Sequence, residues 1–122
     1  MNRVALERSD IVSFHCYEPR PTLNAVIDVL SESGRPLVCT EWLARSAGST
    51  ADLLDVFVER GVGAINWGLV DGRTQTRFPW RSWTEPVGDD EPWFHELLRA
   101  DGSPYSETEA ATFRRLTVSR QT

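Results

Sequence analysis

The chain has 122 residues, of which 40% are apolar and 25% charged, a composition typical of one globular domain with a modest core. Its net charge of -5 argues against nucleic acid as a partner, because phosphate binding needs a basic surface. The sequence holds no run of about 18 apolar residues, so it predicts no membrane span. Five tryptophans are many for this length and weakly indicate a ligand surface.

The amino-terminal part predicts the end of a helix and then a strand. Residues 3–8 read as a last helical turn, and residues 11–17, IVSFHCY, are rich in β-branched and aromatic side chains. A strand alternates its side chains between two faces. One face then carries Ile11, Ser13, His15 and Tyr17, and the helix-packing face carries Val12, Phe14 and Cys16.

Two helices and two more strands are predicted next. Leu23, Val26, Ile27 and Leu30 have helical spacing, with Thr22 as the expected N-cap and Gly34 after the end at about residue 33. Residues 37–41 predict a buried strand. A helix opened by Ser49 and Asp52 as a capping box follows and stops at Gly61, before a strand over residues 62–67. This alternation predicts right-handed crossovers and a parallel sheet.

The carboxyl-terminal part begins with a long loop, residues 69–92. Loops of this length are usually functional or disordered, and the aromatic content of this one favours function. Residues 93–99 predict a short helix. Ser106 and Glu109 form a capping box for a last helix to about Leu116, and residues 117–122 are expected to fray.

Distinctive side chains stand at the ends of all three predicted strands: His15 and Tyr17, Glu41 and Trp42, Asn66 and Trp67. The carboxyl ends of parallel strands share one edge, where α/β folds build their sites. A carboxylate beside an aromatic ring suits sugar chemistry. Taken alone, Glu41 is better explained as the start of a solvated loop, and it is the three strand ends together that favour a site.

The two cysteines are too few for a disulfide scaffold. If Glu41 points into the site, Leu37 and Cys39 share its face, whereas Cys16 lies on the helix-packing face. We therefore expect two free thiols in different layers. No secretion signal is visible in the opening residues, so a cytoplasmic location is the default expectation; the compartment stays open because the amino terminus reads as truncated.

The segments SDIVSFHCYE, GRPLVCTEWLAR and GVGAINWGLVDGRTQT, with a Pro-Trp-x-Ser-Trp loop and a late WFH run, resemble the carboxyl-terminal half of a clan A glycoside hydrolase. The chain looks most like the cellulase-like or β-glycosidase-like (β/α)8 barrels, over roughly Asp10 to Leu116. In that clan the sixth, seventh and eighth strands end in His-x-Tyr, the nucleophile Glu and a Trp. The matching positions here are His15 with Tyr17, Glu41 and Trp67.

The resemblance implies an α/β fold: a partial TIM barrel with about strands six to eight, their helices and a parallel sheet. Residues 1–122 would form a single domain, with loop 69–92 on the active-site side. Glu41 would be the nucleophile of a retaining enzyme acting on β-linked saccharides, with Tyr17 and His15 orienting it. No metal and no cofactor are implied.

The resemblance also implies sugar-binding side chains. Trp67 would be the floor of the subsite next to the scissile bond. Trp42, Trp80 and Trp83 could wall further subsites, although packing roles are about as well expected. For Arg45 and Asp71, solvated loop positions are better expected than contacts with sugar hydroxyls, and His95 is expected to be a surface or packing residue.

A retaining glycosidase needs two carboxylates about 5 Å apart. The family's acid/base Glu follows an Asn on the fourth strand, and this chain has no Asn-Glu pair. We therefore expect a fragment that is inactive alone. Its partners would be an oligosaccharide or glycoside and either the missing amino-terminal half-barrel or a second copy covering the lumen face with Ile11, Leu37 and Ile65. The alternatives are a non-catalytic carbohydrate-binding or vestigial pseudo-enzyme module, and a small α/β scaffold protein.

Overall fold

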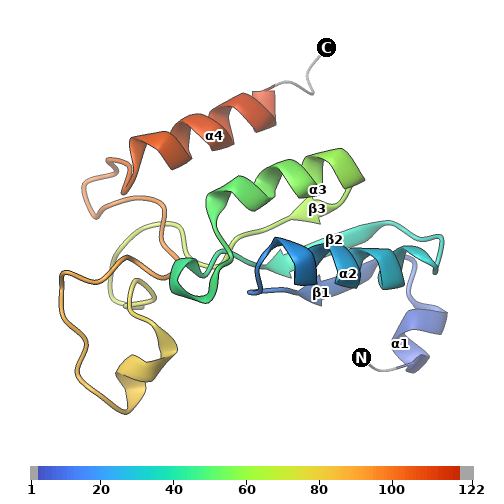
Figure 1. Cartoon of the computed structure of the whole chain (residues 1–122), viewed down its shortest axis with the longest axis horizontal. Helices are drawn as coiled ribbons and strands as arrows, with labels where there is room; N and C mark the ends of the chain where they lie inside the picture. The colour runs from blue at the N-terminus through green and yellow to red at the C-terminus, as the bar shows by residue number, and fades with distance from the viewer. Residues whose placement is uncertain (1–2, 119–122) are drawn as a thin grey trace.

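The computed structural model describes residues 3–118, which form a mixed α/β fold with a three-stranded parallel sheet and four α-helices (Figure 1). The strands pair in the order β1 (Val12–His15), β2 (Leu37–Glu41) and β3 (Gly63–Ala64). The predicted parallel α/β sheet is confirmed. None of the helices in this part of the chain is long and apolar enough to cross a bilayer.

The helices alternate with the strands as expected and are joined by short 3-10 turns. The α-helices are α1 (Arg3–Arg8), α2 (Arg20–Ser31), α3 (Leu54–Arg60) and α4 (Glu107–Val118). The 3-10 turns are η1 (Arg45–Ala47), η2 (Ala51–Leu53) and η3 (Trp80–Trp83). Figure 1 shows α4 lying along α3, and the long segment between β3 and α4 gathered at the carboxyl end of the sheet.

One face of the sheet packs against α2 and α3 and forms the core. In β1, Val12 and Phe14 are buried while Ser13 and His15 are exposed, which is the predicted alternation. The helices contribute apolar side chains at helical spacing, including Leu23 and Ile27 of α2 and Phe57 of α3. Burial of this apolar surface is the main favourable term for the fold.

The opposite face keeps large apolar side chains exposed within the described residues. Ile11 is 54% exposed and Ile65 is 58% exposed. Leu37 was expected beside them, but it is buried in the core instead. The reason is the pairing of the strands, which puts Leu37 opposite Val12 on the helix-covered side.

A β-bulge in the pairing of β1 with β2 corrects the predicted layers. Phe14 pairs with Cys39, but the next residue, His15, pairs with Glu41, so the ladder skips Thr40. The extra residue breaks the alternation that was used to place Cys39 and Glu41 on one face. The regular pairing of Cys39 with Phe14 puts Cys39 in the same core as Cys16, so the two cysteines do not lie in different layers; both thiols are free as predicted.

The helix starts differ from their predictions. Pro19, not Thr22, precedes α2, and Pro21 lies in its first turn, where a missing amide hydrogen costs nothing. The capping box at Ser49 is also wrong, because the Ser49 hydroxyl is buried and accepts a hydrogen bond from the Leu43 amide. Gly61 ends α3 in the left-handed region at φ 65°, as expected.

The segment after the third strand is less regular than predicted. β3 covers two residues, although the amides of Ile65 and Trp67 continue the hydrogen bonding to the carbonyls of Cys39 and Trp42. Residues 93–99 are not helical; Leu98 instead bridges Val70 and Pro104. Helix α4 includes residues 117–118, and the rest of the predicted frayed tail lies outside the described residues.

Candidate functional site

Glu41 is the last residue of β2 and lies at the carboxyl end of the sheet. Its side chain is 25% exposed, and the bulge aligns it with His15 of the neighbouring strand. On a regular ladder His15 would have paired with Thr40, and Glu41 would have pointed to the same face as Cys39. The bulge thus separates Glu41 from the core residue Cys39 and turns the carboxylate toward the open end of the sheet.

Two side chains from β1 and its extension hold the carboxylate of Glu41. The Tyr17 hydroxyl donates a hydrogen bond to Oε2 at 2.6 Å, and Nδ1 of His15 lies 3.3 Å from the same oxygen. Burial, and then the hydrogen bond to Glu41, raise the pKa of Tyr17 well above its usual range. The phenol therefore keeps its proton at neutral pH and acts as a fixed donor. Among the described residues, no hydrogen bond is made to Oε1.

A pocket of about 270 Å³ lies against this carboxylate. This volume lies just below the range of about 300 to 1,000 Å³ that is usual for ligand pockets. Three tryptophans line it: Trp67 follows β3, while Trp80 and Trp83 come from η3 in the long loop. Its remaining lining residues are Tyr17, Glu41, Thr74, Gln75, Thr76, Phe78 and His95. The structure thus brings Glu41, Tyr17, Trp67, Trp80 and Trp83 together at one pocket. His15 contacts Glu41 but does not line the pocket.

Trp42 does not belong to this pocket. Its side chain is 1% exposed and packs against Phe57 of α3 and Phe113 of α4, with ring centroids 5.1 and 6.1 Å apart. The expectation that Trp42 walls a sugar subsite is therefore corrected. Trp42 is a core residue, because it faces the helices immediately after the strand ends.

His95 is the pocket residue that sequence reasoning placed least well. It is buried and packed, as one of its two expected positions implied, but it also lines the pocket. Its Nδ1 lies 2.7 Å from the carbonyl oxygen of Leu43, and its ring lies beside those of Tyr17 and Trp80. A sequence signal did exist: the WFHE run follows the aromatic loop directly, and its first two residues, Trp93 and Phe94, are large aromatic side chains of the kind usually buried.

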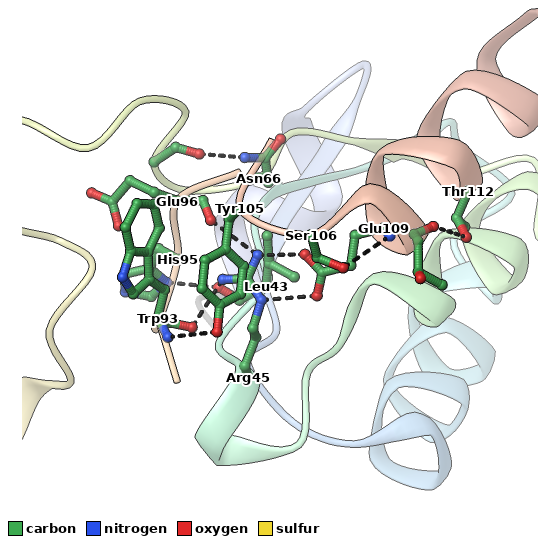
Figure 2. Close-up of polar contacts among 12 residues, drawn as sticks. Leu43, Arg45, Asn66, Trp93, His95, Glu96, Tyr105, Ser106, Glu109 and Thr112 are labelled. Atoms are coloured by element: carbon green, nitrogen blue, oxygen red, sulfur yellow. Dashed lines mark hydrogen bonds and ion pairs between the residues drawn. The ribbon is translucent and has the colours of Figure 1, made fainter. Parts of the chain in front are cut away.

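Arg45 was expected in solvent, but its side chain is buried between α4 and the segment that carries Trp93 (Figure 2). Its guanidinium pairs with Glu109 of α4 at 2.6 Å and donates to the carbonyl oxygens of Trp93 and Glu96. It also lies over the Tyr105 ring. These contacts tie the segment that carries His95 to helix α4 and to the end of β2.

Glu96 and Asp71 stand apart from the predicted chemistry. Glu96 is fully buried and one carboxyl oxygen accepts a hydrogen bond from Thr76, while the other has no hydrogen-bond partner among residues 3–118. Burial raises the pKa of Glu96. Asp71 is not a free solvated group, because it pairs with Arg77 at 3.4 Å.

Within residues 3–118, no cluster of three or more potential ligands is placed to hold a metal ion. The arrangement is one of a fixed carboxylate, a protonated phenol and aromatic platforms. Such groups can attack or bind a small polar ligand with an apolar face. Comparison of the chain with protein-family models, with curated proteins and with solved structures finds no match.

Proposed function

We propose that this chain is the nucleophile-bearing part of a retaining β-glycoside hydrolase of the (β/α)8-barrel type, with Glu41 as the nucleophile. One observation carries the proposal: Oε2 of Glu41 is held by Tyr17 at 2.6 Å and by His15 at 3.3 Å, at the mouth of a tryptophan-lined pocket. Fixing one oxygen orients the other for attack on a bound sugar.

The chemistry follows from this geometry. Oε1 of Glu41 attacks the anomeric carbon and forms an ester bond with the sugar, while the bond from that carbon to the leaving oxygen breaks. The Tyr17 hydroxyl keeps its hydrogen bond to Oε2 throughout. It stabilises the carboxylate before the attack, and again when water displaces the carboxylate from the sugar in the second step. A tryptophan such as Trp67 packs on the apolar face of the sugar ring.

The pocket supplies one half of the required pair of acids. Among its lining residues, which all belong to the described part of the chain, Glu41 is the one carboxylate. A retaining enzyme needs a second carboxylic acid to protonate an ordinary leaving group. The proposal therefore places the acid/base on a partner half-barrel or on a second copy, and it gives the chain alone no activity on unactivated glycosides.

The single carboxylate also favours one alternative, a non-catalytic carbohydrate-binding module. Such a module needs aromatic platforms but no nucleophile. The two proposals differ in what Glu41 does: a module tolerates its replacement, whereas a hydrolase half loses covalent chemistry. An unrelated scaffold role would require neither the pocket nor the Tyr17 contact.

An activated substrate tests the proposal on the chain as it stands. A 2,4-dinitrophenyl 2-deoxy-2-fluoro-β-glycoside needs no acid, because the dinitrophenolate leaves without a proton, and the fluorine slows hydrolysis of the ester. Gluco, manno and xylo versions are incubated with the protein and followed by intact-mass spectrometry. We expect a mass gain of one fluoroglycosyl group on the wild type and none on Glu41→Gln.

Glu59→Gln is the matched control, because Glu59 is an exposed carboxylate on α3 and does not line the pocket. It should label like the wild type. Sugar binding that persists without an adduct, and that Glu41→Gln leaves unchanged, would contradict the hydrolase proposal and support the binding module.

A further inference from the structure

His95 stands in the pocket as a polar group with no assigned task. Its side chain is 2% exposed and lines the same hollow as Glu41 and Trp67, although it comes from a segment that follows the long loop. A buried imidazole at a ligand pocket is costly unless its nitrogens find partners. One ring nitrogen, Nδ1, has a partner within the described protein, and the other, Nε2, is left to contact a ligand.

The partner of Nδ1 fixes the tautomer. The Leu43 carbonyl oxygen, 2.7 Å away, can only accept a hydrogen bond, so Nδ1 carries the hydrogen. Burial lowers the pKa of His95, and the positive charge of Arg45 acts in the same direction, so the ring is neutral near pH 7. Nε2 therefore holds a lone pair, and within residues 3–118 no hydrogen bond is made to it.

The surroundings hold the ring in place. Tyr17 lies at 5.4 Å, Trp80 at 6.0 Å and Phe94 at 4.4 Å between ring centroids. Gly68, at φ 79°, packs so closely that an added Cβ would lie 3.1 Å from the Cβ of His95. Gly68 thus packs on the base of the side chain, while the Leu43 hydrogen bond and the three rings fix the imidazole, so Nε2 keeps one direction.

We infer that Nε2 of His95 accepts a hydrogen bond from a hydroxyl group of the sugar, and so makes this pocket select for a pyranoside that carries that hydroxyl. The inference rests on the proposed glycoside-binding function of the pocket and adds the polar group that reads the ligand. The Tyr17 hydroxyl is already committed to Glu41, and the tryptophans offer apolar faces. A fixed acceptor left unpaired by a deoxy sugar penalises that sugar, which is how hydrogen-bonding sites discriminate.

The test uses His95→Asn in the full chain. The Asn amide nitrogen occupies nearly the position of Nδ1 and keeps the donor to Leu43, but nothing replaces Nε2. Dissociation constants are measured by tryptophan fluorescence for methyl β-glucoside and for its 2-, 3-, 4- and 6-deoxy analogues. We expect His95→Asn to bind the glucoside about threefold to tenfold more weakly, the loss of one neutral hydrogen bond.

The deoxy analogues distinguish a direct hydrogen bond between His95 and the sugar from an indirect effect of the substitution on the fold. One analogue should bind His95→Asn at least as tightly as it binds the wild type, because it lacks the hydroxyl that pairs with Nε2 and the variant has no acceptor to leave unpaired. Equal weakening of all five ligands would mean that His95 only supports the fold, and unchanged affinities would also overturn the inference.

A spectroscopic measurement on the unmodified protein covers the case in which His95→Asn fails to fold. The chain has two histidines, so ¹⁵N-histidine spectra are assigned by comparison with His15→Gln. The His95 Nε2 resonance should be of the unprotonated type and should shift on addition of methyl β-glucoside. A protonated Nε2, or no shift on saturation, contradicts the inference. Failure of every glycoside to bind the wild type overturns it as well, whereas labelling of Glu41 decides the hydrolase proposal separately.

Discussion

The two faces of the sheet are built from the same three strands but differ in the burial of their side chains and in their polarity. The helix-covered face carries Val12, Phe14 and Cys39, all buried against α2 and α3. The opposite face and the carboxyl end carry Ile11 and Ile65, both more than half exposed, and the polar residues around Glu41. The helix-covered face therefore supplies the stability of the fold, whereas the opposite face and the carboxyl end of the sheet are available for binding.

The largest change in the free energy of unfolding should come from truncating a side chain on the helix-covered face. Phe57→Ala removes a fully buried ring that packs on Trp42, and we expect it to cost about 3 to 5 kcal/mol of unfolding free energy. Ile65→Thr on the opposite face should cost less than about 0.5 kcal/mol. Urea denaturation of both variants measures the difference. Comparable losses of unfolding free energy would show that the open face is covered in solution, and so would contradict the proposed difference between the two faces.

A second prediction concerns Arg45, which joins the two regions. Arg45→Met leaves Glu109 and two carbonyl oxygens without their donor. We expect it to lower the free energy of unfolding by about 2 to 4 kcal/mol, less than the roughly 3 to 5 kcal/mol for fully buried pairs because Glu109 is 20% exposed. Arg114→Met is the control, since Arg114 is exposed and lies 4.0 Å from Glu107; it should change little. The same denaturation experiment applies. A near-zero effect at Arg45 would mean that α4 and the pocket segment are held independently.

The smallest expected effect is a change in pH dependence at Glu96. Because the pKa of Glu96 is raised in the folded state, folding binds a proton there, and that contribution to stability is full at acid pH and is lost as pH rises through the folded pKa. Glu96→Gln cannot ionise and should lack this part of the decline. Unfolding free energies of both proteins at pH 5 and pH 8 give the comparison. Parallel pH profiles would show that Glu96 ionises as readily folded as unfolded.

The parts of the fold that follow local patterns could be predicted from the sequence. The alternation of β1, the bounds of β2 and the end of α3 at Gly61 all depend on periodicity or on a glycine that permits positive φ. The meeting of Tyr17 with Glu41 followed from a similar argument, since carboxyl ends of parallel strands share one edge.

What could not be predicted depends on contacts between distant segments. The bulge at Thr40 is a property of the pairing of two strands, and it moves Glu41 off the core face on which Cys39 is buried. Arg45 and Trp42 follow a strand end and look like loop residues until α4, more than 60 residues later, supplies Glu109 and Phe113. His95 reaches the pocket because an irregular segment returns to the sheet, for which no periodic signal exists.

The strand order carries a consequence for how such a fold can evolve. The three strands lie in the sheet in the order in which they occur in the chain. A helical segment connects β1 to β2, and another connects β2 to β3. Within the described residues, β1 and β3 each keep one side unpaired, so a further strand can join either side. Whole strand-and-helix units can therefore be added by duplication or fusion at either end without repacking the interior, while the residues at the strand ends remain free to vary.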